Sequence, residues 1–82
     1  MEITYKSEAL KNLKKIGAKY LSKIRRKILT LGYNPLSGKL LQGQLKGYRC
    51  LRAWPLRIIY TYNPKTKTII IETVDYRGDV YK

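Results

Sequence analysis

Histidine and phenylalanine are absent from this sequence of 82 residues, and cysteine and tryptophan each occur once. The single cysteine, Cys50, excludes an intramolecular disulfide, and without histidine or a second cysteine an ordinary zinc site cannot form. The Ser-His-Asp and Cys-His arrangements of nucleophilic catalysis are excluded as well. The five acidic residues are too few, in so basic a chain, to predict a metal site made of carboxylates. We therefore expect neither a metal nor another cofactor.

Long apolar runs are also absent. Residues 1–6 contain no apolar signal segment, and no apolar run approaches the roughly 18 residues that a membrane-spanning helix requires. We expect a protein that is neither exported by a classical signal nor inserted in a membrane, and the cytoplasm is the default location. The length indicates one small domain, residues 1–82, with a thin core.

Negative charge is scarce. Five Asp and Glu stand against 18 Lys and Arg, which gives a formal net charge of +13. Self-repulsion at this charge density opposes the compact state. A polyanionic partner compensates for it, and the two candidates are nucleic acid and an acidic protein segment. Nucleic acid is the favoured partner on charge alone.

Hydrophobic periodicity predicts helices in the first half of the chain. Residues 2–6 indicate a short strand. Ser7 is the predicted cap of a first helix, which ends at Gly17, and a second helix ends at Gly32. The second helix is predicted from an apolar stripe: Leu21, Ile24, Ile28 and Leu31.

The second half of the chain changes to the pattern of strands. Residues 33–47 are rich in turn-forming residues and predict a loop, and strands follow at 48–54, 56–62 and 68–75. The order β-α-α-β-β-β indicates an α+β fold, with a helix hairpin packed on one face of a small antiparallel sheet. Alternation along the strands then leaves arginines and tyrosines on the open face, which predicts a basic, aromatic surface.

Four arginines of the strand half are the first candidates for a functional site, since arginine suits bidentate phosphate contacts. They are Arg49, Arg52, Arg57 and Arg77. Any one of these arginines could instead be an ordinary solvated surface cation. That alternative is weaker for three arginines that converge in space. Alternation places Arg49 on the opposite face from Arg52.

Aromatic residues are the second group of candidates, because they offer faces on which unpaired bases stack. The sequence has eight tyrosines, of which Tyr60 and Tyr62 follow core periodicity, while Tyr76 and Tyr81 flank Arg77. Trp54 either stacks on a base, anchors a partner or marks a hairpin corner before Pro55. Cys50 is most simply a small buried hydrophobic residue.

Two segments of the sequence resemble the RelE/ParE superfamily of toxins. Residues 47–60, GYRCLRAWPLRIIY, resemble the central hairpin of that family, and residues 75–81, DYRGDVY, resemble its closing R-x-x-[VA]-Y segment. Length, charge and element order agree with this, so the resemblance covers the whole chain. It implies a RelE-like fold and a toxin of a type II pair, neutralised by a cognate antitoxin through an acidic, partly disordered segment.

RelE-like members of this family enter the ribosomal A site and cut mRNA without a metal, with the RNA's own 2′-OH as nucleophile. By resemblance Arg57 and Arg77 would contact the scissile phosphate and Arg52 an adjacent one. Tyr81 would stack on a base or transfer a proton. Further contacts with RNA are predicted for four residues: Arg49, Tyr76, Trp54 and Lys46.

The sequence departs from the family pattern at three places. Trp54-Pro55 replaces a Gly-polar turn, Tyr76 stands where many members have His or Lys, and positions 48 and 50 hold no Lys. The missing cations favour a ParE-like inhibitor of DNA gyrase without RNA chemistry, whereas the presence of Tyr81 favours the nuclease. A homologue that only binds RNA or an antitoxin is the third alternative.

Overall fold

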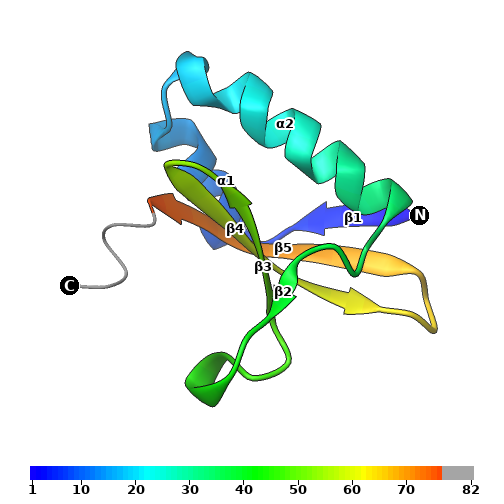
Figure 1. Ribbon diagram of the computed structural model, residues 1–82. Coiled ribbons are helices and arrows are strands. Elements are labelled where there is room, and N and C mark those ends of the chain that lie inside the picture. The colour runs from blue at the N-terminus through cyan, green and yellow to red at the C-terminus, as the bar shows by residue number, and fades with distance from the viewer. Residues whose placement is uncertain (77–82) are drawn as a thin grey trace.

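The computed structural model describes residues 1–76 (Figure 1). The predicted site residues Arg77 and Tyr81 therefore lie outside the described residues. Along the chain the elements are β1 (Glu2–Tyr5), α1 (Ser7–Lys15), α2 (Ala18–Tyr33), β2 (Lys39–Leu40), a short 3-10 helix (Gly43–Leu45), β3 (Arg49–Ala53), β4 (Leu56–Asn63) and β5 (Thr68–Tyr76).

The strands form one five-stranded sheet in the order β1-β5-β4-β3-β2. The pairs β3–β4 and β4–β5 are antiparallel, as expected for strands joined by short turns. The predicted antiparallel sheet is found in these pairs, but β1 pairs with β5 in parallel, so the sheet as a whole is mixed. The chain leaves β1 through two helices rather than a tight turn, so nothing constrains β1 to run antiparallel to its neighbour.

The predicted loop at 33–47 also contains regular structure. β2 pairs with β3 through Lys39 and Leu40, and the 3-10 helix follows it. Two residues are too few to show an alternating pattern, which is why the sequence gives no sign of this edge strand.

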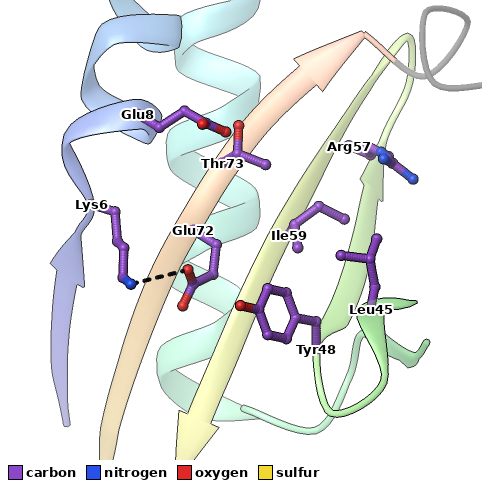
Figure 2. Close-up of a pocket in the computed structure, with 8 residues that line it drawn as sticks. All are labelled: Lys6, Glu8, Leu45, Tyr48, Arg57, Ile59, Glu72 and Thr73. Atoms are coloured by element: carbon purple, nitrogen blue, oxygen red, sulfur yellow. Dashed lines mark ion pairs between the residues drawn. The ribbon is translucent and has the colours of Figure 1, made fainter. Parts of the chain in front are cut away.

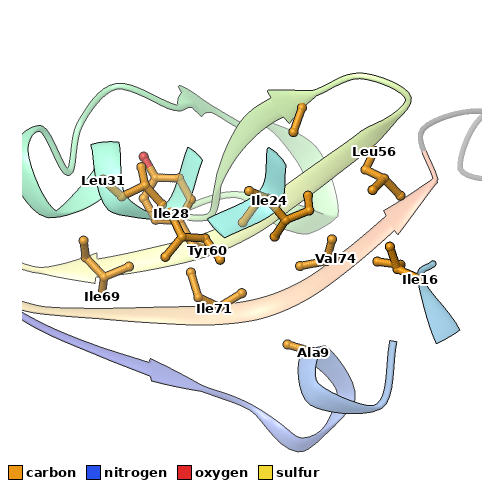
Figure 3. Close-up of a cluster of buried hydrophobic side chains, with 12 residues drawn as sticks. Ala9, Ile16, Ile24, Ile28, Leu31, Leu56, Tyr60, Ile69, Ile71 and Val74 are labelled. Carbon is orange, nitrogen blue, oxygen red and sulfur yellow. The ribbon is translucent and has the colours of Figure 1, made fainter. Parts of the chain in front are cut away.

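Both helices lie on the same face of the sheet, as the sequence predicts (Figure 1). Their apolar stripes pack against the inward residues of β3, β4 and β5 (Figure 3). The buried core comprises Ala9, Ile16, Ile24, Ile28, Leu31, Ala53, Leu56, Ile58, Tyr60, Ile69, Ile71 and Val74.

In residues 1–76 no helix is both long and apolar enough to cross a membrane.

Two predicted helix ends are displaced. Ser7 is the first residue of α1 and Lys6 takes the N-cap position, with no side-chain capping bond. α2 continues through Gly32 to Tyr33, and the Asn34 N–H donates to the carbonyl of Thr30. A helix tolerates a glycine when its neighbours are held by packing, and the preceding residue here is fully buried in the core.

Tyr60 fixes the segment that leaves α2. Its ring is fully buried, its hydroxyl donates to the Pro35 carbonyl at 2.7 Å, and it accepts from the Gly38 N–H at 2.9 Å. A Cβ at Gly38 would lie 2.7 Å from the ring, so only glycine allows this approach. Burial raises the pKa of the Tyr60 phenol. The prediction that Tyr60 is a core residue is confirmed.

Candidate functional site

The open face of the sheet carries a row of charged residues across three strands. Arg52 of β3 lies opposite Arg57 of β4, and Arg57 lies opposite Asp75 of β5. Arg52 is exposed, whereas only 7% of Arg57 is exposed, and its Nε donates to Asp75 Oδ1 at 2.9 Å. The structure thus brings together the two hairpin arginines predicted from the sequence, but pairs one with a carboxylate.

A pocket of about 350 Å³ opens beside this row (Figure 2). Its walls come from both halves of the chain: the residues that join β1 to α1, the 3-10 helix, and strands β4 and β5 with the start of β3. Figure 2 shows the Tyr48 hydroxyl and the Glu72 carboxylate turned toward each other. The lining residues are Lys6, Glu8, Leu45, Tyr48, Arg57, Ile59, Glu72 and Thr73.

Carboxylates balance the cations of this pocket. Lys6 Nζ lies 3.6 Å from Glu72 Oε1, and the Thr61 hydroxyl donates to Glu72 Oε2 at 3.2 Å. Glu8 lines the same pocket and Asp75 holds Arg57. The open face is therefore of mixed charge where the sequence predicts a basic one.

The sequence does not predict three residues that line the pocket: Lys6, Tyr48 and Glu72. Lys6 reaches the site because β1 pairs with β5, which the element order does not reveal. Glu72 sits at a register shift, since Ile59 pairs with Thr73 while Tyr60 pairs with Ile71. Such a bulge breaks the alternation used to assign faces. One usable signal is that two of the five acidic residues, Glu72 and Asp75, fall within the last strand.

Two other predicted residues lie on the helix-covered face. Arg49 donates through Nη1 to the Gly38 carbonyl at 2.9 Å, and its cross-strand partner is the buried Tyr60. Tyr76 is 41% exposed and lies opposite the core residue Leu56. Its ring makes an edge-to-face contact with Tyr20 at 6.4 Å. The predicted convergence of Arg49 with the other arginines is not found, as strand alternation already indicated.

The remaining predicted residues are at the periphery. Trp54 is 67% exposed in the β3–β4 turn, before a cis peptide bond to Pro55, and its carbonyl accepts a hydrogen bond from Lys23 Nζ. Lys46 is exposed directly after the 3-10 helix, next to a residue that lines the pocket. Roles in RNA binding for these residues stay predictions.

A second hollow, of about 340 Å³, lies between β1, α1 and α2 and is mostly apolar. Leu10 is 48% exposed there and Tyr5 39%. Lys14 and Arg25 add positive charge to the groove. The other lining residues are Leu13, Leu21, Ile24 and Ile28. Exposed apolar surface rimmed by charge is typical of protein contacts.

Metal chemistry has no visible basis in the part of the chain that the structure describes. Residues 1–76 contain no group of three or more His, Cys, Asp or Glu side chains able to hold an ion.

Comparison with known proteins agrees with this architecture. The family profile described as the ParE toxin of type II toxin-antitoxin systems, parDE, matches residues 3–81. No curated protein sequence matches the chain. Among solved structures, the RelBE2 toxin–antitoxin complex from Mycobacterium tuberculosis is similar at 26% identity and a TM-score of 0.85, over 93% of this chain and 96% of that one.

Two further structures show the same fold at lower identity. YafQ from E. coli strain BL21(DE3) has 21% identity and a TM-score of 0.80, over 99% of this chain and 98% of its own. The archaeal RelE–RelB complex from Pyrococcus horikoshii OT3 has 22% identity and a TM-score of 0.80, over 94% of each chain. The expected RelE-like fold is confirmed.

Proposed function

The chain belongs to the family of ParE toxins of type II toxin–antitoxin systems, and because its fold is also similar to that of RelE toxins we propose that it is an endoribonuclease that cuts mRNA on the ribosome. As a toxin of such a pair, it has a cognate antitoxin as its partner. The finer activity rests on one observation, the pair Arg52–Arg57 on the open sheet face beside the pocket that Arg57 lines.

Cleavage with the 2′-OH as nucleophile requires stabilisation of the charge that develops on the phosphate. Two arginines on adjacent strands supply planar donors for that charge. The bond from Arg57 to Asp75 supports this role, because it orients the guanidinium before the substrate binds. Arg52 is exposed and suits contact with the backbone phosphate of a strand that crosses the sheet.

Proton transfer also has a candidate within the pocket. The Glu72 carboxylate faces the pocket with the Tyr48 hydroxyl opposite (Figure 2), so it is placed to accept the 2′-OH proton. The leaving 5′-oxygen requires a proton in return. Tyr81, assigned from the sequence to base stacking or proton transfer, is the predicted donor.

Mapping of mRNA ends by primer extension in a translation reaction tests this proposal. Cuts within codons that appear only while ribosomes translate are expected. Glu72→Gln should slow cutting by about 10²- to 10⁴-fold as a lost general base, and Arg52→Gln by roughly 10²-fold. Matched controls are Glu2→Gln and Lys67→Gln, which change exposed residues outside the pocket. Intact mRNA with the folded wild-type protein contradicts the nuclease.

Inhibition of DNA gyrase is the second candidate, and one observation favours it. Arg57 is almost fully buried and paired with Asp75, so much of its charge is compensated before any RNA binds. A toxin that acts by binding another protein has no need of a free phosphate-binding arginine. Growth arrest with intact mRNA and accumulating DNA breaks would select this function over the first.

A further inference from the structure

The outward face of α2 carries a continuous stripe of cations. Lys19, Lys23, Arg26 and Lys27 recur at spacings of three and four residues, which places them on one side of the helix. Ile24, Ile28 and Leu31 occupy the other side and are buried in the core. These four cations, called the α2 stripe below, extend with Thr30 over about 16 Å of helix at 1.5 Å per residue.

The α2 stripe has no carboxylate to balance it. Residues 9–71 contain no Asp or Glu, so neither α2 nor the segments on both sides of it supply negative charge. The helix packs on the face of the sheet opposite to the pocket, and in Figure 2 it lies behind the strands that carry the pocket side chains. The carboxylates of Glu72 and Asp75 belong to that other face.

The β3–β4 turn, which carries an exposed aromatic residue, contacts the stripe. Lys23 Nζ donates to the carbonyl of Trp54, which joins α2 to the β3–β4 turn. Trp54 itself is 67% exposed. An exposed indole on a turn that contacts a cationic helix offers a ring on which an unpaired base can stack, while the cations of the helix hold phosphates.

We infer that the α2 stripe and Trp54 form a docking surface for RNA with unpaired bases, separate from the pocket on the sheet. The inference rests on the proposed ribonuclease function, since a nuclease that works on the ribosome has to bind folded RNA as well as the strand it cuts. The surface holds the RNA that positions the protein, and the pocket takes the strand that reacts.

The lining of this surface favours RNA over an acidic protein segment. The hollow of about 300 Å³ along the stripe is lined by Lys23, Arg26, Lys27 and Thr30, all of them polar. An amphipathic helix binds through large apolar anchors, and no apolar residue lines this hollow. Such anchors would find apolar surface in the groove that contains Tyr5 and Leu10.

Two charge-matched variants test the stripe. The stripe variant is Lys19→Gln/Arg26→Gln/Lys27→Gln, and the control is Lys11→Gln/Lys65→Gln/Lys67→Gln, at exposed positions that line none of the hollows described above. Each lowers the net charge by three, from +13 to +10. Lys23 is kept because it holds the turn at Trp54. Thermal unfolding checks that both variants fold.

The measurement is the affinity for an RNA hairpin with an unpaired loop, determined by fluorescence anisotropy between 50 and 300 mM salt. Each lost phosphate contact reduces the log–log salt slope by about 0.7, so the stripe variant should lose roughly two from its slope. The control variant should keep the wild-type slope. Equal loss in both variants, or an unchanged slope in the stripe variant, overturns the inference. If the wild-type protein binds duplex DNA as tightly as the RNA hairpin, RNA is not the specific ligand of this surface.

A second pair of variants tests the aromatic part. Trp54→Ala should weaken binding to the looped hairpin by about tenfold and leave binding to a fully paired RNA unchanged, because only an unpaired base can stack. Tyr33→Ala, which removes an aromatic residue that is 91% exposed elsewhere on α2, is the control and should change neither. Equal affinity of Trp54→Ala and wild type for the looped hairpin contradicts the role of Trp54.

These assays are independent of the nuclease assay. The hairpin is bound without ribosomes, so a failure of the proposed function shows as absent mRNA cuts together with an intact stripe effect. A failure of this inference alone shows as ribosome-dependent cutting that the stripe variant retains at the wild-type rate.

Discussion

The outward face of α2 and the open face of the sheet use charge in opposite ways. On α2 the cations have no carboxylate nearby in the sequence, and along one side of the helix Lys19 and Arg26 are exposed while Lys23 and Lys27 are half-buried. On the sheet, Arg57 and Lys6 each lie within salt-bridge distance of a carboxylate, Asp75 and Glu72. Uncompensated charge attracts a polyanion over long distances, whereas paired charge fixes a side chain in place. The same residue types therefore serve attraction on one face and orientation on the other.

The largest expected effect comes from removing one partner of the sheet pair. Asp75→Ala leaves Arg57 buried without its carboxylate, which should lower the free energy of unfolding by about 3 kcal/mol. Urea unfolding at pH 7 measures this. The matched change on the other face, Lys23→Ala, removes an exposed hydrogen bond to a carbonyl and should cost under about 1 kcal/mol. Similar losses of stability in the two variants would contradict the difference between the two faces.

An intermediate effect is expected for Tyr60→Phe, which changes the core and neither face. The variant leaves the Gly38 N–H and the Pro35 carbonyl without their partner, at a cost of about 1–3 kcal/mol at pH 7. Affinity for the RNA hairpin should be unchanged. A large loss of affinity in a folded variant would show that the core, and not the α2 stripe, controls RNA binding.

Alkaline pH should reduce the difference in the free energy of unfolding between wild type and Tyr60→Phe. Burial raises the pKa of Tyr60 above its ordinary value of 10.0, so above that pH the unfolded chain loses the proton first. Because the folded state then binds more protons than the unfolded chain, stability falls as the pH rises above 10. Below pH 10 the contribution of Tyr60 to the free energy of unfolding is fully present. Urea unfolding of both proteins from pH 7 to 11 tests this, and a constant difference across that range contradicts it.

The smallest expected effect is a gain in stability for the stripe variant. Removing three unbalanced cations relieves self-repulsion, which should raise the free energy of unfolding by a few tenths of a kcal/mol at low salt. The gain should vanish at 1 M salt, where screening acts within about 3 Å. Glu72→Gln, on the other face, should show no such gain because it removes a carboxylate near Lys6. Thermal unfolding at the two salt concentrations compares them.

Local patterns were sufficient to predict most of the fold. The helical stripe of Ile24 and Ile28, the short turn at Pro55 and the alternation in β3 and β4 each depend on neighbouring residues. The parallel pairing of β1 with β5 is different, since it joins Glu2 to Thr68 and no local pattern records it. The same distance in sequence hides the contribution of Lys6 to the pocket.

Only part of the candidate site could be predicted from the sequence, and the reason is related. Alternation and resemblance placed Arg52 and Arg57 together, and the register confirms their position opposite each other. The burial of Arg57 and its bond to Asp75 depend on β5, and a single bulge at Glu72 shifts the faces of that strand. Assigning charge to a face from sequence requires the register of every strand, which composition does not contain.

The position of β5 between β1 and β4 has a consequence for how the protein is made. β5 joins β1 to β4, so a chain that has been synthesised only to residue 67 lacks the strand that connects its first segment to the rest of the sheet. Pairings so distant in sequence form late. The pocket takes Lys6 from the segment after β1 and Glu72 from β5, so it is assembled only after residue 67 has been synthesised. Any activity that depends on this pocket is therefore absent from the growing chain until β5 has been synthesised.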